Sequence, residues 1–239
     1  MRNTFPSVAT EFSARTIFEQ LDDAGVSWKT YYSQIAFSQL YAYVRDTGAD
    51  NLAPLADFFT AVAAGTLPQV TYIDPAFFGE DQNDEHPPSN AQKGQKLVAD
   101  VVQAVFDSPL WSHTALIITY DEHGGYWDHV PPPAACEPDA ILPILNPSDT
   151  VALFDRYGVR VPLVVVSPFS RKKYVSHTTT DQTSALRFIQ TRFDLPALTR
   201  RDANASALLE MFDFDNPPFL TPPSLPPARI NPVREAQCP

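Results

Sequence analysis

Basic residues are scarce in this chain of 239 residues. Seventeen lysines and arginines stand against 28 aspartates and glutamates, which gives a formal net charge of -11. Nucleic-acid binding depends on neutralising phosphates with basic side chains, and the chain has no long Lys/Arg block. The composition therefore argues against nucleic acid as a partner and disfavours tight docking on anionic membranes.

Long apolar runs and a cysteine framework are also missing. No stretch approaches the roughly 18 apolar residues of a spanning helix, and the N-terminal region shows no basic start followed by an apolar core. The sequence thus predicts no transmembrane segment and no signal peptide. Cys136 and Cys238 form no CxxC pattern or Cys/His cluster of a zinc site. They either pair in an oxidising compartment or stay separate thiols, because spacing alone decides neither.

What is present suffices for one sizeable core, since 44% of the residues are hydrophobic and 12% aromatic. Apolar spacing predicts helices over Arg15–Ala24, Leu55–Ala64, Ala91–Phe106 and Gln182–Phe193. Alternating or β-branched segments predict strands over Val26–Tyr32, Gln69–Asp74, Leu116–Tyr120 and Val161–Val166. Alternation of helices and strands predicts an α/β domain with a mostly parallel sheet and helices on both faces.

Prolines crowd the C-terminal segment, residues 216–239. They are expected to prevent a regular helix or a central strand, so we predict an extended tail after a domain of residues 1–215. This tail either lies along the domain through Phe219 and Leu225 or acts as a linker.

The stretch Thr114–Pro133 is the strongest candidate for a functional site. Leu116–Tyr120 is short, β-branched and aromatic, as in an interior strand of a parallel sheet, and such sheets bind ligands beyond the carboxyl ends of their strands. Asp121 and Glu122 stand at that position. A partly buried pair of carboxylates requires a cation between them or protonation of one, and metal coordination is the simpler interpretation. The alternative is a solvated acidic turn.

His86 is a second candidate, in a polar and irregular segment beside Asp84 and Glu85 and before a proline pair. Taken alone, a histidine in an acidic loop is more often a solvated surface group than a catalyst.

Several long motifs follow one another along the chain. TYDEHGGYWDHVPPP is the most specific, and TIFEQLDDAGVSWKTYY, DQNDEHPPSNAQKGQKLV and VRVPLVVVSPFSRKKYVSHTTTDQTSALRFIQTRFDLPAL extend the pattern over residues 16–214. Together they resemble the phosphoesterase family of phosphatidylcholine-type phospholipases C and acid phosphatases. The resemblance implies an alkaline-phosphatase-like α/β/α sandwich, metal-dependent hydrolysis of phosphoesters such as phospholipids, and a secreted or periplasmic location.

The DEHGG motif carries the residue roles that this resemblance implies for the metal and the substrate. Asp121 and Glu122 match the family's ligands for a divalent metal ion. His123 and Gly124 follow them in the same motif and are expected to bind substrate.

Two histidines are implied as catalytic residues. His86 matches the histidine of the family's Asp/Glu-His-Pro motif at the phosphate site, which makes it a phosphate contact or an acid–base group. His177, in VSHT, matches a segment that also faces the site and is a weaker candidate.

The resemblance is incomplete on its N-terminal side. The family's Glu-Asn motif and the segment with its Ser or Thr nucleophile have no counterpart in this sequence, so the nucleophile is unknown. We therefore expect residues 1–215 to be the C-terminal portion of a phosphoesterase catalytic domain. Its incomplete sheet is expected to leave open edges that self-associate. The alternative is a truncated, inactive homologue that binds metal, a phosphate headgroup or a partner chain.

Overall fold

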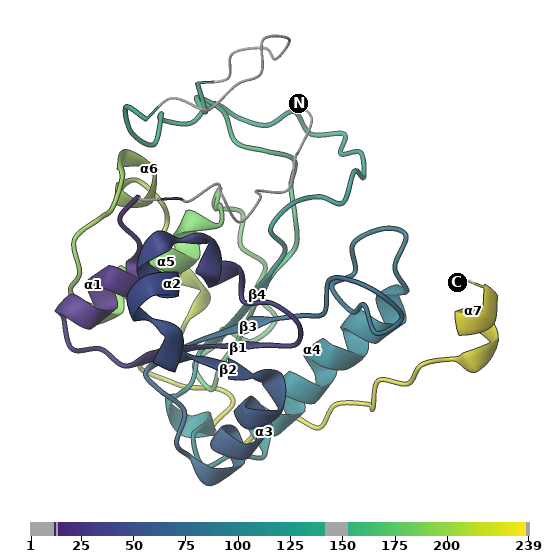
Figure 1. Ribbon diagram of the computed structural model, residues 1–239. Helices are drawn as coiled ribbons and strands as arrows, with labels where there is room; N and C mark the ends of the chain where they lie inside the picture. Colours follow the sequence, from purple (N-terminus) through teal and green to yellow (C-terminus); the bar gives the residue numbers. More distant parts are fainter. Residues whose placement is uncertain (1–11, 13, 142–152, 238–239) are drawn as a thin grey trace.

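The computed structural model describes residues 12, 14–141 and 153–237 (Figure 1). Its helices and strands, in chain order, are α1 (Ile17–Asp23), β1 (Trp28–Tyr32), η1 (Phe37–Leu40), α2 (Ala42–Thr47), η2 (Ala49–Asn51), β2 (Leu52–Pro54), α3 (Leu55–Ala64), β3 (Val70–Asp74), α4 (Ala91–Phe106), η3 (Trp111–His113), β4 (Leu116–Thr119), β5 (Leu163–Val166), α5 (Thr183–Phe193), α6 (Arg200–Ala203), η4 (Leu209–Met211) and α7 (Pro232–Gln237). The order confirms the predicted α/β class. None of these helices has the length and apolar content needed to cross a membrane.

The first sheet has three strands in the order β2–β1–β3, all parallel. In its middle strand, Thr30 lies opposite Leu52 of β2 and Tyr72 of β3. Side chains of β1 enter two separate cores: Trp28 packs with α1 and α2, whereas Tyr31 packs with α3 and α4. Helices therefore cover both faces of this parallel sheet, as the sequence predicts.

Local signals set the helix boundaries. Thr16 and Glu19 form a capping box at the start of α1, in which each side chain accepts the backbone N–H of the other residue. The Asn90 side chain accepts the N–H of Gln92 at the start of α4. Gly65 ends α3 in the left-handed region, at φ 70°. These signals are local, so they can be recognised in the sequence alone. As predicted, α3 spans Leu55–Ala64 and α4 spans Ala91–Phe106.

The second sheet corrects one prediction. β4 pairs antiparallel with β5, with Leu116 opposite Val166 and Thr119 opposite Leu163, and no further strand joins either within the described residues. The prediction that Leu116–Tyr120 is an interior strand of a parallel sheet is therefore wrong. An apolar run indicates burial but not strand direction or the number of neighbours. Despite its apolar sequence, β4 is only partly buried.

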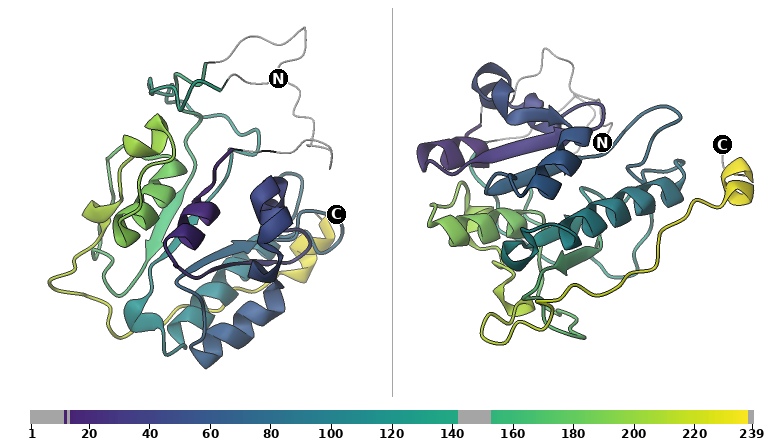
Figure 2. Two further views of the ribbon diagram at one scale, coloured as in Figure 1. Left: turned by 60° about the vertical axis from the view of Figure 1, so that its left-hand side comes forward. Right: turned by 90° about the horizontal axis from the view of Figure 1, so that it is seen from below.

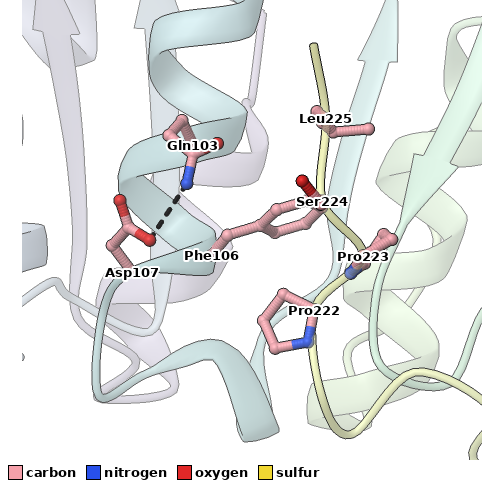
Figure 3. Close-up of a pocket in the computed structure, with 7 residues that line it drawn as sticks. All are labelled: Gln103, Phe106, Asp107, Pro222, Pro223, Ser224 and Leu225. Carbon is pink, nitrogen blue, oxygen red and sulfur yellow. Dashed lines mark hydrogen bonds between the residues drawn. The ribbon is translucent and has the colours of Figure 1, made fainter. Parts of the chain in front are cut away.

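The C-terminal segment lies along the domain. The indole Nε1 of Trp111 donates a hydrogen bond to the carbonyl of Phe219 at 2.9 Å, and Phe219 packs against the core of α3 and α4. The segment Pro222–Leu225 then passes beside Phe106 of α4 (Figure 3), and the tail continues to α7 (Figure 2). The expectation that its prolines prevent a regular helix is wrong at α7. Pro232 occupies the first helical position, where a missing N–H costs nothing.

The possible disulfide is not decided by the structure. Cys136 is exposed, and its Sγ lies 3.4 Å from the carbonyl of Arg200. Cys238, the other cysteine, lies outside the described residues, so the pairing stays a prediction.

Candidate active site

A large cavity lies between β3 and β4, with a volume of about 2320 Å³. The predicted site residues that line it are His86, Asp121, Glu122, His123 and Gly124. Two segments that are distant in the sequence, the loop after β3 and the turn after β4, therefore meet at one site.

Two glycines shape the turn after β4. The carbonyl of His123 accepts a hydrogen bond from the N–H of Tyr126 at 3.0 Å, and Gly124 and Gly125 between them have φ values of 61° and 77°. Positive φ at both central positions is typical of a type I′ turn, which glycine adopts without a steric penalty. A Cβ on Gly124 would also lie 3.0 Å from Cδ of Pro87. The turn thus packs closely against the loop that follows β3.

His86 and Glu122 face each other where these two segments meet. Nε2 of His86 lies 3.5 Å from Oε1 of Glu122, and the two side chains are 60% and 47% exposed. Nδ1 of His86 lies 2.8 Å from the carbonyl of Pro87, which only accepts hydrogen bonds, so Nδ1 carries a hydrogen in this arrangement. Nε2 is therefore the ring nitrogen that faces the carboxylate. The other oxygen of Glu122 accepts the N–H of Gly124 at 2.9 Å.

Glu85 and Tyr120 hold the His86 loop against the end of β4. The Tyr120 hydroxyl donates a hydrogen bond to the Glu85 carboxylate. Burial, followed by this contact with Glu85, raises the pKa of Tyr120 to about 12, so the hydroxyl keeps its proton at neutral pH. Gly94 of α4 makes room for the contact, because a Cβ there would lie 2.2 Å from Cγ of Glu85.

Asp121 and Glu122 do not complete a metal site by themselves. Oδ1 of Asp121 accepts the N–H of Glu122 at 2.9 Å. Across the described ranges, no group of three or more histidine, cysteine, aspartate or glutamate residues is arranged to hold a metal ion. Carboxylate oxygens suit a hard divalent cation, but two side chains fall short of the roughly six ligands that such an ion takes. The type of donor fits the predicted metal, and the number of donors does not.

His177 is not brought to this site. It is exposed in the loop before α5 and does not line the cavity. From this part of the chain, Gln182 reaches the site: its Nε2 donates to the carbonyls of Tyr120 and Asp121 at 3.3 and 3.1 Å. A catalytic role for His177 stays a prediction.

An ion pair that no sequence pattern indicates secures the segment after the turn. Arg160 donates two hydrogen bonds to the carboxylate of Asp128, at 2.7 and 2.8 Å. These contacts hold the pKa of Asp128 well below its usual range. The two residues are far apart in the sequence, and no local spacing rule predicts their pairing.

Asp74 was not predicted as a site residue either, although it is the last residue of β3 and lines the cavity. Burial raises its pKa to about 6, against the opposing effect of a hydrogen bond from the N–H of Phe37 at 2.9 Å. The signal in the sequence was its position. Asp74 is an acidic residue at the end of a strand, and Asp121 likewise comes shortly after the end of β4.

Comparison with known proteins identifies the family to which these segments belong. The Phosphoesterase family profile matches residues 1–196, which include both segments of the site. This chain belongs to the phosphoesterase family. The membership confirms the resemblance that the motifs indicate.

Several curated phosphoesterase relatives align with most of this chain. Non-specific phospholipase C1 of Arabidopsis thaliana is 32% identical over 92% of this chain and 44% of that protein. Phospholipase C B of Mycobacterium tuberculosis is 32% identical over 92% of this chain and 47% of that protein. Non-specific phospholipase C6 of Arabidopsis thaliana is 33% identical over 95% of this chain and 47% of that protein. The chain thus spans about half the length of the curated relatives that it matches.

Proposed function

We propose that this phosphoesterase chain takes part in the hydrolysis of phosphoric ester bonds, with phospholipids as the substrate class. The observation that carries the proposal is the 3.5 Å approach of His86 to Glu122, which joins two separate motifs in one cavity. The names of the relatives, which are phospholipases C, support the substrate class.

Electrostatics supports a divalent metal ion as the cofactor. A phosphodiester anion beside Asp121 and Glu122 meets two negative charges, and this repulsion is relieved when a cation lies between them. We propose that both carboxylates contribute ligands and that the remaining ligands come from outside the described residues. When bound, such an ion stabilises the negative charge that develops on the phosphoryl oxygens.

His86 is proposed as the acid–base group. The carbonyl of Pro87 fixes a hydrogen on Nδ1, so Nε2 is placed to exchange a proton with the phosphoester or with its leaving group. In the neighbouring turn, Nδ1 of His123 lies 2.8 Å from the carbonyl of Tyr126, which orients that ring beside the cavity as a substrate contact. The nucleophile is not identified among the described residues.

The architecture and location of the protein are part of the proposal. Family membership and the helices on both faces of the β2–β1–β3 sheet support one alkaline-phosphatase-like α/β/α sandwich. The family resemblance supports a secreted or periplasmic location.

Hydrolysis of p-nitrophenyl phosphorylcholine tests the proposal. The chain alone is expected to turn over far below about 1 per second, because no nucleophile is identified. The assay therefore uses the chain fused to the part of non-specific phospholipase C1 that lies outside the matched region. Asp121→Ala and Glu122→Ala should each abolish activity with unchanged far-UV circular dichroism, since each removes a ligand and not a packing group.

His86→Ala should lower turnover by roughly 100-fold to 10,000-fold while the metal content is preserved, and His177→Ala should have a smaller effect. If Asp121→Ala kept both its metal and its rate, the carboxylate pair would be an ordinary acidic turn. If the fusion were inactive with every phosphoester and metal tried, hydrolysis would be ruled out. The second candidate, a non-catalytic chain that binds metal, a headgroup or a partner, would then stand. The incomplete ligand set in the described chain favours this candidate.

A further inference from the structure

Glu85, the residue before His86, has a backbone conformation that residues with a side chain rarely adopt. Its φ is 64°, in the left-handed region, where Cβ crowds the backbone. Four other non-glycine residues have a positive φ in the described ranges, and none of these four lines the cavity, whereas Glu85 does. Such strain persists only where the surrounding structure holds the residue, and it concentrates at functional sites. The contacts of Glu85 therefore show what keeps it in place.

The side chain of Glu85 is held from two directions. The hydroxyl of Tyr120, the residue that follows β4, donates a hydrogen bond to Oε2 of Glu85. The carboxylate also lies against Gly94 of α4, where a Cβ would be 2.8 Å from Oε1. Tyr120 is itself fixed, because its carbonyl accepts a hydrogen bond from Nε2 of Gln182 at 3.3 Å. Glu85 thus connects the His86 loop to the end of β4 and to α4.

Short-range hydrogen bonds fix the backbone of His86 relative to Glu85. The N–H of His86 donates to Oδ1 of Asp84 at 3.1 Å, and its carbonyl accepts from the N–H of Ser89 at 2.9 Å. The same oxygen of Asp84 accepts from Oγ of Ser89 at 3.4 Å, which closes the turn. Residues 84–89 therefore form one unit, so the contacts that hold Glu85 also set the place of the imidazole.

Two polar contacts between side chains join this unit to residues 119–125 in the part of the chain that the structure describes. One is the 3.5 Å approach of His86 to Glu122, whose side chains are 60% and 47% exposed. An exposed pair of this kind contributes little to stability. The other, from Tyr120 to Glu85, is partly buried and has a carboxylate acceptor, and such hydrogen bonds are roughly twice as strong as neutral ones. It is therefore the stronger link between the two segments.

We propose that Glu85 and Tyr120 are positioning residues for His86. Their hydrogen bond fixes the unit of residues 84–89 on the end of β4, two residues before Glu122, so that Nε2 of His86 stays directed at the phosphoester. Neither residue exchanges a proton with the substrate in this role, and both act through His86. The inference rests on the proposed function of His86 as the acid–base group and adds the two residues on which its placement depends.

The contact between His86 and Glu122 in the full chain tests the geometry without any reaction. NMR should show a nuclear Overhauser contact between the His86 ring and the γ protons of Glu122. Tyr120→Phe keeps the ring and removes the donor, so this contact should be lost while far-UV circular dichroism is unchanged. Glu85→Gly accepts the left-handed conformation without strain but has no carboxylate, so it should lose the contact too. Glu85→Gln keeps an oxygen acceptor and should retain it.

Kinetics of the fusion used in the hydrolysis assay show whether the pair acts through His86. Tyr120→Phe should lower kcat by roughly 10-fold to 100-fold with KM unchanged, because a displaced acid–base group no longer meets the reacting atoms. Glu85→Gly should show a similar loss, and Glu85→Gln should recover most of it. In a protein that already carries His86→Ala, Tyr120→Phe should cost no further activity, since the group that it positions is gone.

Tyr43→Phe is the matched control, because it removes a hydrogen bond of the same kind away from the site. The hydroxyl of Tyr43 donates to Oδ2 of Asp22 at 2.8 Å, and neither of these residues lines the cavity. This variant should change neither kcat nor the contact between His86 and Glu122.

Three results would overturn the inference. The contact is absent from the unmodified chain or survives Tyr120→Phe, kcat is unchanged in Tyr120→Phe, or Tyr120→Phe costs as much activity with His86→Ala as without it. The last result would mean that Tyr120 acts on the substrate directly. If Tyr120→Phe fails to fold, Glu85→Gly and Glu85→Gln decide. An inactive fusion would count against the proposed function, and the contact in the full chain would then decide the inference by itself.

Discussion

Burial and pairing move the pKa values of two carboxyl groups near the cavity in opposite directions. Burial raises the pKa of Asp74 to about 6, whereas the hydrogen bonds from Arg160 lower that of Asp128. The raised pKa means that the folded protein binds more protons than the unfolded chain, so this contribution to stability falls as pH rises from about 4 to about 6. The lowered pKa of Asp128 acts in the reverse sense, and its contribution is lost as the pH falls below about 4.

Asp74→Asn should therefore stabilise the protein above about pH 6 and change little below about pH 4. A pKa difference of about 2 corresponds to about 3 kcal/mol, which sets the expected upper limit of the gain. Urea unfolding of both proteins between pH 3.5 and 7.5 measures the difference. Asp50→Asn, at an exposed position, serves as the control. An equal gain for Asp74→Asn at every pH would show that burial of its charge is not the cause.

At the scale of elements, the helix bounds that depend on neighbouring residues could be predicted from the sequence. Asn90 and Gly65 mark helix ends, so α3 and α4 were predicted with their observed bounds. Strand pairing and ion pairs between residues that are distant in the sequence could not be predicted. The apolar run of β4 predicts burial, but its antiparallel pairing with β5 depends on a segment more than forty residues later. The pair Asp128 and Arg160 was missed for the same reason.

Gly94→Ala tests how α4 positions the His86 loop. Alanine normally stabilises a helix relative to glycine by roughly 1 kcal/mol. Here its Cβ would lie 2.2 Å from Cγ of Glu85 and 2.9 Å from the backbone carbonyl of Asn83. The variant should instead be destabilised by about 1–3 kcal/mol, with faster amide exchange across residues 81–86.

The exposed Gln95→Ala in the same helix is the matched control and should be neutral or slightly stabilising. The double variant Gly94→Ala, Glu85→Ala should recover part of the loss, because it removes the closest clash. A Gly94→Ala protein as stable as Gln95→Ala would show that Glu85 moves away without cost.

At the scale of the whole molecule, the motifs predicted the family and some of the residues that line the cavity. His86 and Glu122 come from different motifs. The resemblance to the family placed both residues at one site, whereas no local spacing in the sequence predicts that they lie close together. His177 was carried over by the same resemblance, but it lies outside the cavity. The contribution of Gln182 could not be predicted, because its contact with the end of β4 depends on how α5 packs.

Open edges and exposed apolar side chains predict that the isolated chain self-associates. Trp127 is 85% exposed and Val164 of β5 is 51% exposed, and unpaired edges readily accept further strands. Multi-angle light scattering should detect oligomers whose mass rises with concentration. A single monomer peak with a cooperative melting transition would contradict this expectation.

NMR titration of the histidine rings with phosphocholine and Ca²⁺ tests most directly the central claim that the His86 loop and the turn after β4 form one phosphoester site. The titration uses the fusion of the hydrolysis assay, because the remaining metal ligands are proposed to come from outside the described residues. We expect saturable shifts of the His86 and His123 ring signals that need Ca²⁺ and disappear in Glu122→Ala. Unshifted ring signals, or shifts that persist in Glu122→Ala, would contradict it.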